Sequence, residues 1–271
     1  MTDQMQGRVL DPDHPCKTPN LDRLASKGIR FTRAYTPNAV CSPARASLMT
    51  GLLPHNHGVL TVTHVVDDDQ SVLRVDHPHW AQRLASAGYR TSYFGKWHVE
   101  RTFDLERFGW NVNGSEGSEL LREAESKVRE TVASSDFSLE MHLENPPGYR
   151  RERFYGVTNV PPEQRPVGIR TRLALDFLDE VIDGSEPWCC FVSVIEPHDP
   201  FICGEEAFSQ YNVDDIDLPP NVHDDMANRP AIYRKAARTW HGMTDQQHKE
   251  AAACYYAGIT EIDQQFGRLI K

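Results

Sequence analysis

A run of mostly apolar residues from Trp188 to Ile195 most constrains the fold of this chain. Such a run is typical of a strand buried on both faces, which occurs in parallel sheets that carry helices on each side. The preceding segment, Arg170 to Ile182, has apolar residues at helical spacing, and Gly184 follows it as a stop. A helix that leads into a buried strand predicts an α/β fold.

The same alternation is predicted in the rest of the chain. We expect a capped helix from Thr18 to Gly28, an alternating strand from Ile29 to Tyr35, a helix from Trp80 to Ala87 and a strand from Tyr89 to Phe94. A last helix should bury one face formed by Tyr255, Ile259, Ile262, Phe266 and Leu269. No cap or strand follows that helix and almost nothing precedes Asp3, so we expect a fold truncated at both ends.

Residues from about 103 to 165 are polar and include proline-rich and glycine-rich pieces, with one helical stretch near Glu119 to Val132. We interpret this segment as a variable insertion over the site, within a single domain that spans residues 1–271.

The composition limits the classes of molecule that this chain is expected to bind. With 271 residues, 39% of them hydrophobic, the chain can bury a substantial core. Its net charge of -10 disfavours nucleic acid and anionic membranes, so its basic groups should be sought in one cleft. No apolar run is long enough to span a membrane, and the N-terminus has no signal-peptide pattern. We therefore expect a cytoplasmic protein, or an exported one if the N-terminus is truncated; the six cysteines lack paired metal-ligand spacing.

The stretch from Cys41 to Gly51 predicts a short helix with a cysteine at its mouth. Ser42 can cap this helix, Pro43 suits its first position and Gly51 can supply a left-handed stop. Backbone N–H groups and the helix dipole favour an anion there, and Arg45 adds a fixed charge within one turn. A nucleophile at position 41 would face an oxyanion site, whereas a small buried cysteine beside a capped helix is the alternative.

Polar groups follow two further predicted strands. Lys96 and His98 lie in G-K-W-H after the strand that ends at Gly95, and His198 lies in E-P-H-D-P-F after the apolar run. Because ligands bind at the carboxyl ends of strands in open α/β sheets, we expect these groups to meet Cys41 and Arg45 in one cleft.

Together these motifs resemble the sulfatase family. The resemblance rests on the helix T-P-N-L-D-R-L, on C-x-P-x-R followed by Thr50-Gly51, on G-K-W-H and on P-H-x-P-F, all in the family order. It implies an alkaline-phosphatase-like sandwich, with a mixed, mostly parallel sheet flanked by helices. Residues 1–271 would form the N-terminal portion of the catalytic domain.

The resemblance also implies a chemistry. Cys41 would be oxidised to formylglycine by a formylglycine-generating enzyme, and a hydroxyl of the hydrated aldehyde would attack sulfur in line. Arg45, Lys96 and His198 would supply charge to the sulfate oxygens, with His198 also helping the alcohol to leave. His98 would then act as a base on the remaining hydroxyl, which releases sulfate and restores the aldehyde.

In the family a calcium ion lies under the nucleophile, so Asp3 and the residue at position 41 are the predicted metal ligands. The family's later ligands have no match in this chain. The expected substrate is a small-molecule or saccharide sulfate ester whose alcohol part the sequence does not specify. Two alternatives stay open: a phosphonate or phosphate ester hydrolase of the same superfamily, and an inactive fragment that only binds anions.

The sequence gives less specific predictions for the other histidines and acidic residues that follow the Cys41 helix. We expect His55 and His57 either to line the site or to be polar residues of a turn after the nucleophile helix. In the histidine-rich and acidic stretch around His64, we interpret the run from Asp67 to Asp69 as solvated surface.

Overall fold

The structure is a computed structural model that describes residues 1–74, 78–132, 139–146, 153–238 and 240–270. The chain divides into two compact units. Unit 1 comprises Met1–Asp3, Ala25–Thr131 and Pro166–Ile195, and unit 2 comprises Gln4–Leu24, Val132–Arg165 and Glu196–Lys271.

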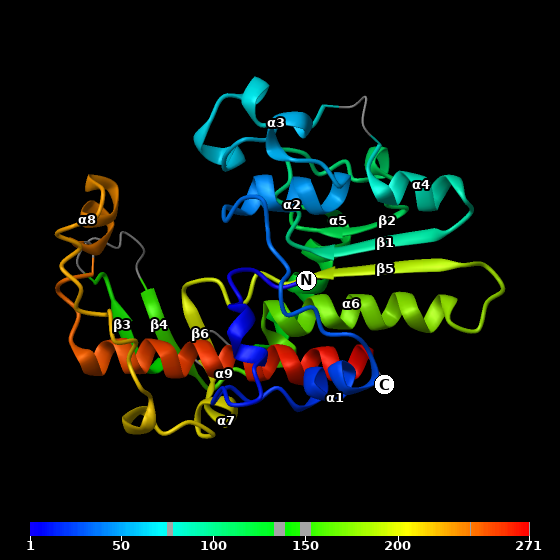
Figure 1. The fold of residues 1–271 in the computed structure, drawn as a ribbon. Helices are drawn as coiled ribbons and strands as arrows, with labels where there is room; N and C mark the ends of the chain where they lie inside the picture. Colours follow the sequence, from blue (N-terminus) through cyan, green and yellow to red (C-terminus); the bar gives the residue numbers. More distant parts are fainter. Residues whose placement is uncertain (75–77, 133–138, 147–152, 239, 271) are drawn as a thin grey trace. The chain divides into compact units, whose positions relative to one another are not determined.

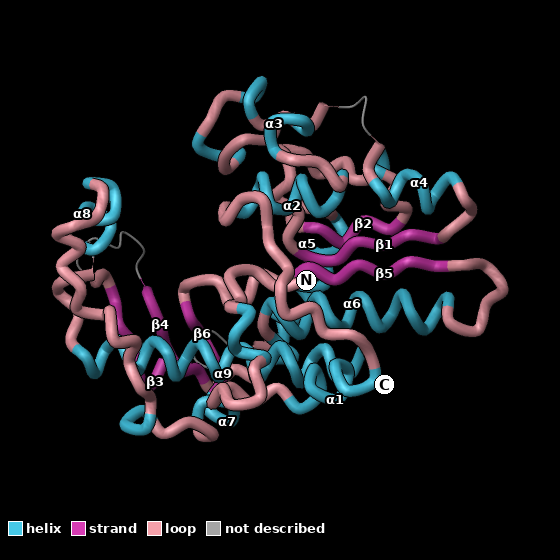
Figure 2. Tube along the Cα trace, viewed as in Figure 1, coloured by secondary structure: helices cyan, strands magenta, loops and turns pink. Residues whose placement is uncertain are grey.

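Unit 1 is built on a three-stranded parallel sheet in the order β2-β1-β5, seen edge-on in Figures 1 and 2. Its strands are β1 (Arg90–Gly95), β2 (Val112–Ser115) and β5 (Trp188–Ser193). Tyr93 in the central strand pairs with Asn113 on one side and Phe191 on the other. The two predicted strands of this sheet are confirmed, and their parallel pairing brings their carboxyl ends to one edge.

Helices cover both faces of this sheet. α4 (Trp80–Ser86) and α6 (Pro166–Val181) both contact β1, and Figure 1 shows them on opposite sides of the strands. α2 (Cys41–Thr50) packs on α4, and α5 (Glu119–Thr131) packs on α6 and β2. The unit also contains α3 (Pro54–His57) and the short 3₁₀ helices η2 (Thr63–Val65), η3 (Asp68–Gln70) and η4 (Glu106–Phe108).

Strand β5 is less buried than its apolar sequence predicts. Trp188 is 38% exposed, and the residues from Cys189 to Val192 are half-buried. Among the described residues, the edge of β5 that faces away from β1 is bordered by Met1, whose carbonyl accepts a bond from the Val194 N–H at 3.0 Å. An edge strand keeps part of its surface open, which explains the difference.

Unit 2 contains a second three-stranded sheet in the order β3-β4-β6, with an antiparallel and a parallel pair. Its strands are β3 (Leu139–Glu144), β4 (Arg153–Thr158) and β6 (Phe201–Gly204). The long helix α9 (Asp245–Leu269) packs on β4 and β6. Its predicted buried face is confirmed at Tyr255, Ile259 and Ile262. The unit also contains η1 (Gly7–Leu10), η6 (Pro162–Gln164), α7 (Glu205–Phe208), η7 (Val213–Asp215) and α8 (Ala231–Arg238).

The segment from about 103 to 165 is divided between the two units. It supplies β2 and α5 to unit 1, where β2 extends the parallel sheet, and β3 and β4 to unit 2. The predicted helix in this segment is confirmed. Its status as a variable insertion in one domain stays a prediction.

The predicted strand from Ile29 to Tyr35 does not form. These residues make a loop with turns, and the side chains of Ile29, Phe31 and Tyr35 are 83%, 78% and 87% exposed. A strand needs a neighbour that satisfies its backbone groups, and none of the described strands pairs with this segment. Alternation alone was therefore an insufficient signal here.

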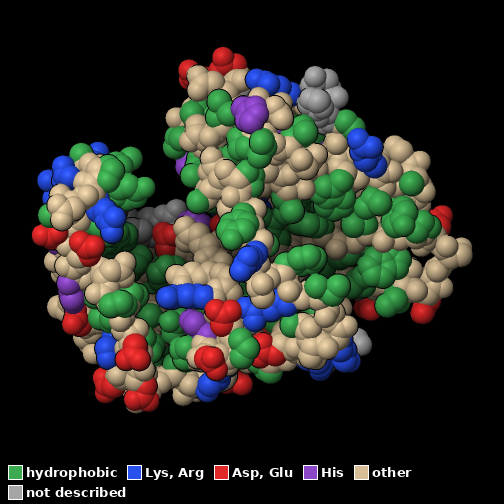
Figure 3. Space-filling view, viewed as in Figure 1, with side chains coloured by type: hydrophobic (Ala, Val, Ile, Leu, Met, Phe, Trp, Pro, Cys, Tyr) green, Lys and Arg blue, Asp and Glu red, His purple; other side chains and the backbone are tan. Residues whose placement is uncertain are grey.

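Helix α8 of unit 2 carries several basic side chains. Arg234, Lys235 and Arg238 lie on α8, which has no buried residue, and basic side chains gather over this helix in Figure 3. None of the described helices is long and apolar enough to cross a membrane.

Helix α1 (Pro19–Lys27) begins in unit 2, where it is capped by a residue of α9 that is distant in the sequence. The buried Asp263 on α9 accepts bonds from the backbone N–H groups of Asn20 at 3.1 Å and Leu21 at 2.7 Å. Thr18, the predicted cap, instead donates its hydroxyl to Asp22 at 3.2 Å. The first N–H groups of a helix have no partner within the helix, so Asp263 satisfies donors that would otherwise be unpaired.

We expect Asp263→Ala to lower the free energy of unfolding by about 2–3 kcal/mol, because two partly buried N–H donors and the Asn20 amide lose their acceptor. Urea unfolding followed by circular dichroism measures this change. The matched control is Asp215→Ala, which removes an exposed carboxylate and should change the value by less than about 0.5 kcal/mol. Equal effects of the two substitutions would contradict the capping role.

Candidate functional site

Cys41 is the first residue of α2 in unit 1. Val40 occupies the cap position without a side-chain bond, so the predicted cap by Ser42 is wrong. Ser42 lies within the first turn, where its hydroxyl accepts a bond from the Thr63 N–H at 3.3 Å. The predicted stop is confirmed, because Gly51 has a left-handed φ of 72°. Cys41 therefore lies in the turn whose N–H groups have no partner within the helix.

A buried ion cluster lies beside Cys41. One oxygen of the Asp3 carboxylate is 2.6 Å from the Lys96 ammonium and 3.2 Å from the Arg45 guanidinium. The exposed fractions of Asp3, Arg45 and Lys96 are 8%, 1% and 5%. This cluster has one more positive than negative charge in a place with little water. Such a site favours an additional anion.

Hydrogen bonds fix this cluster to the carboxyl edge of the sheet. Arg45 donates at 2.8 Å to the carbonyl of Lys96 and at 2.8 Å to the hydroxyl of Ser193, at the end of β5. The Tyr93 hydroxyl donates to the same Lys96 carbonyl at 2.6 Å. Arg45 thus joins the nucleophile helix to the ends of two strands, and the cation positions are set by the sheet.

The Cys41 thiol lies directly over these charges. Its sulfur is 3.7 Å from each Asp3 oxygen and 3.9 Å from the Lys96 ammonium. Burial, and then the Asp3 carboxylate, raise the pKa of the Cys41 thiol above its ordinary value, although Lys96 and Arg45 oppose this shift. The unmodified side chain is therefore protonated at neutral pH and is a poor thiolate nucleophile.

His98 follows Lys96 in the loop after β1, with a left-handed backbone φ of 48°. Its Nε2 lies 3.2 Å from Nδ1 of His64, and its Nδ1 is buried without a hydrogen-bond partner among the described residues. Burial, and then the charge of Lys96, lower the pKa of His98 to about 4. The imidazole is therefore neutral at physiological pH and able to accept a proton.

His198 belongs to unit 2. Its Nδ1 lies 2.6 Å from the backbone carbonyl of Asp199 and 3.1 Å from the carboxylate of the same residue. These acceptors favour a proton on Nδ1, which leaves the lone pair on Nε2. The structure thus brings Asp3, Cys41, Arg45 and Lys96 into contact, while the predicted convergence with His198 stays a prediction.

The two histidines that follow the nucleophile helix differ in surroundings. His57 is buried, with Nε2 2.9 Å from the Ser47 hydroxyl and Nδ1 accepting the Val59 N–H at 3.2 Å. These bonds tie α2 to α3, which supports the turn interpretation for His57. His55 is exposed.

Sequence reasoning did not assign Ser193, Tyr93 or His64 to the site. Ser193 had a weak signal, as the one hydroxyl within the apolar run from Trp188 to Ile195. His64 acts through His98, 34 residues later in the sequence, which no local pattern indicates. The Tyr93 bond to the Lys96 carbonyl is local, but it depends on the turn that follows β1.

The described residues do not fit the predicted calcium ion. They contain no group of three or more histidine, cysteine, aspartate and glutamate side chains that could hold a metal. The carboxylate of Asp3 faces two cations, and calcium needs about six to eight oxygen ligands. Asp3 and Cys41 alone cannot supply them.

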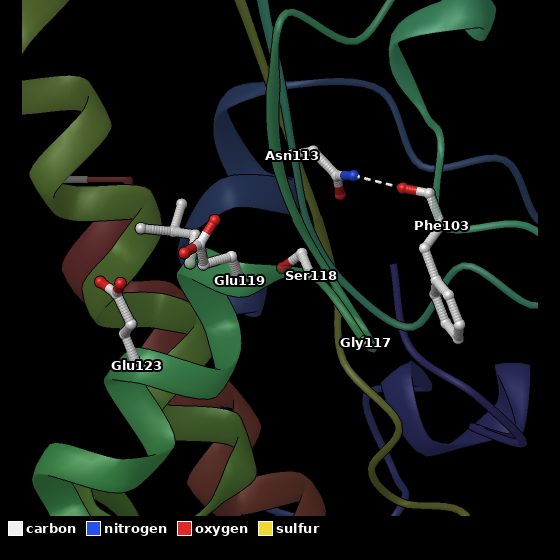
Figure 4. Close-up of a pocket in the computed structure, with 7 residues that line it drawn as sticks. Phe103, Asn113, Gly117, Ser118, Glu119 and Glu123 are labelled. Carbon is white, nitrogen blue, oxygen red and sulfur yellow. Dashed lines mark hydrogen bonds between the residues drawn. The ribbon is translucent and has the colours of Figure 1, made fainter.

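A separate pocket of about 560 Å³ lies in unit 1 between Phe103 and the start of α5. Figure 4 shows its lining, which includes Ser118, Glu119 and Glu123 and the bond from the Asn113 amide to the carbonyl of Phe103 at 2.6 Å. None of the seven lining residues is one that we predicted for chemistry.

We expect NMR titration of labelled histidines to give His98 a pKa of about 4. Lys96→Met should raise this pKa but leave it below 6.5, because burial is the larger cause. The unfolded chain takes up the proton first, so the stability that His98 contributes is present above pH 6.5 and is lost as the pH falls toward 4. The His98 signal is assigned as the one that is missing from the spectrum of His98→Gln. A wild-type His98 pKa at or above 6.5 would contradict the predicted effect of burial.

We expect this chain to bind calcium with a dissociation constant above about 10⁻³ M, because one carboxylate shared with two cations is a poor ligand set. Calorimetric titration of the wild type and Asp3→Asn measures this. Tight binding that Asp3→Asn abolishes would contradict this prediction, because it would require calcium ligands in addition to Asp3 and Cys41.

Comparison with known proteins agrees with these observations. A sequence model of the family described as Sulfatase matches residues 2–271. The chain is 29% identical over 268 residues to the uncharacterized sulfatase YidJ of Escherichia coli K12, covering 94% of this chain and 48% of that protein. It is 30% identical over 286 residues to an arylsulfatase of Clostridium perfringens, covering 100% of this chain and 57% of that protein. The chain thus spans about half the length of these curated relatives.

A solved structure, the phosphonate monoester hydrolase from Silicibacter pomeroyi, superposes with a TM-score of 0.74 at 22% identity, covering 100% of this chain and 57% of that chain. This likeness concerns the fold alone, and it confirms the predicted alkaline-phosphatase-like α/β architecture. The family match covers nearly the whole chain, and three predicted site residues form a buried ion cluster beside Cys41 in unit 1. The chain belongs to the sulfatase family.

Proposed function

We propose that this chain carries the nucleophile and the main anion-binding groups of an enzyme that hydrolyses sulfate esters. The observation that carries the proposal is the buried cluster of Asp3, Arg45 and Lys96, which has an excess positive charge and lies against the first residue of α2. A sulfate monoester is a compact anion, so it complements this charge. Because the groups are buried and fixed, they need little reorganisation as charge shifts during the reaction.

The state of Cys41 supports a modified nucleophile. Its surroundings raise the pKa of the thiol, which disfavours thiolate chemistry. We propose that a formylglycine-generating enzyme converts Cys41 to formylglycine, whose hydrated aldehyde supplies an oxygen nucleophile. The Asp3 carboxylate, 3.7 Å from the sulfur, is then placed to orient a hydroxyl group at this position.

The other residues of unit 1 have separate roles in this proposal. Lys96, with its ammonium 3.9 Å from the Cys41 sulfur, contacts substrate oxygens. Arg45 holds the Lys96 carbonyl and the Asp3 carboxylate in place. His98, neutral with a pKa of about 4, accepts the proton whose removal releases sulfate. His198 assists the leaving alcohol in the family pattern, and this role stays a prediction.

The substrate class is proposed from the relatives. Two of them are described as an arylsulfatase and a choline-sulfatase, and a solved structure with 19% identity is described in complex with a disulfated glucosamine. We propose a small-molecule or saccharide sulfate ester for this chain. A phosphonate or phosphate ester is the second candidate, because the same cluster would attract any tetrahedral anion of this size.

The test compares aryl sulfate, aryl phosphate and aryl phosphonate esters with one leaving group. The chain is produced in a host that makes formylglycine, and mass spectrometry of the Cys41 peptide gives the aldehyde fraction. We expect kcat/KM for the sulfate to exceed the other two at least about tenfold, although turnover should be slow because the described residues lack a metal site.

Controls make this result specific. Cys41→Ala should lower turnover by at least about 10³-fold, since it removes the nucleophile. Cys190→Ala, which alters a cysteine of β5 that does not contribute to the ion cluster, should retain turnover. A faster phosphonate reaction would favour the second candidate. Aldehyde-bearing protein that binds sulfate without any turnover would favour the anion-binding alternative.

A further inference from the structure

In unit 1, His98 contacts His64, a residue that none of the family motifs includes. Nε2 of His98 and Nδ1 of His64 are 3.2 Å apart, and the two rings are nearly coplanar, with 10° between their planes. One of these two nitrogens must carry the shared proton, and the other must accept it. The pair therefore links the tautomer of His98 to the tautomer of His64.

The burial of His98 selects between the two arrangements. If His64 donated the proton, neutral His98 would carry its hydrogen on Nδ1, which is buried and has no acceptor among the described residues. Buried N–H donors without an acceptor are rare in folded proteins. If His98 donates from Nε2, its Nδ1 needs no acceptor, and the remaining N–H of exposed His64 can bond to water.

His64 is held in position by the nucleophile helix itself. The N–H of Thr63 donates to the hydroxyl of Ser42, the neighbour of Cys41, at 3.3 Å. On the other side, the Arg101 guanidinium donates to the carbonyl of Val66 at 2.5 Å. The 3₁₀ turn that carries His64 is thus bonded both to the start of α2 and to the loop that follows His98.

We infer that His64 is a positioning residue that holds the His98 ring with its proton on Nε2 and its lone pair on Nδ1. The inference rests on the proposed function, in which His98 is the base. Nδ1 takes one proton from a hydroxyl group at position 41, and the proton already on Nε2 stays there, bonded to His64. The resulting imidazolium later gives the proton on Nδ1 to water, and both histidines return to their neutral forms.

The tautomer of His98 can be measured without any enzyme assay. The ¹⁵N shifts of labelled histidine distinguish a protonated Nε2 from a protonated Nδ1, and His98→Gln assigns the signals. At pH 7 we expect wild-type His98 to show protonated Nε2. His64→Ala should produce a mixture of tautomers, whereas His64→Asn should retain the wild-type signal, because its amide oxygen can accept the same bond.

Turnover of the aldehyde-bearing chain gives the second readout. We expect His64→Ala to lower kcat about tenfold with KM within about twofold, as for other partners that orient a catalytic histidine. His64→Asn should recover most of kcat. The control His55→Ala removes an exposed histidine of the same unit and should change neither readout.

Two results would overturn the inference. The first is an unchanged His98 tautomer in His64→Ala, and the second is a His64→Asn protein as impaired as His64→Ala. Failure of the proposed function would look different: no variant would hydrolyse sulfate esters, yet the tautomer would still respond to His64.

Discussion

The bond between the carboxylate of Asp3 and two buried cations is the interaction on which the site in unit 1 depends. Without Asp3, Arg45 and Lys96 would place two like charges in a region with little water, at a large cost in desolvation and repulsion. With it, the cluster keeps one excess positive charge. The protein therefore tolerates the charge that an anionic substrate needs, because a fixed carboxylate offsets part of its cost.

The sheet makes that arrangement possible. β1 and β5 are parallel and in register, so Gly95 lies opposite Ser193, and the residues that follow both strands emerge at one edge. Arg45 reaches this edge from α2 and bonds to both strand ends. A shift of one residue in the pairing would separate the Lys96 carbonyl from the Ser193 hydroxyl. Backbone register thus determines the spacing of the two groups that Arg45 contacts, although Arg45 and Ser193 are 148 residues apart in the sequence.

The sequence was most informative where chemistry and local structure share a short motif. C-x-P-x-R and G-K-W-H located Cys41, Arg45 and Lys96, and helical periodicity located α6 and α9. It failed where the partner lies far away in the chain. The strand expected from Ile29 to Tyr35 lacks a neighbour among the described strands, and the cap of α1 comes from Asp263. The His64–His98 bond likewise depends on the tertiary fold, which local patterns do not encode.

The cap of α1 has a consequence for synthesis on the ribosome. Asn20 and its capping carboxylate are 243 residues apart, so all the residues between them must be synthesised before this contact can form. Until then the first N–H groups of α1 can bond only to water, and the isolated short helix is only marginally stable. Contacts of such long separation are formed slowly. Helix α1 therefore gains its cap only after α9 has been made, although the residues of α1 are synthesised much earlier.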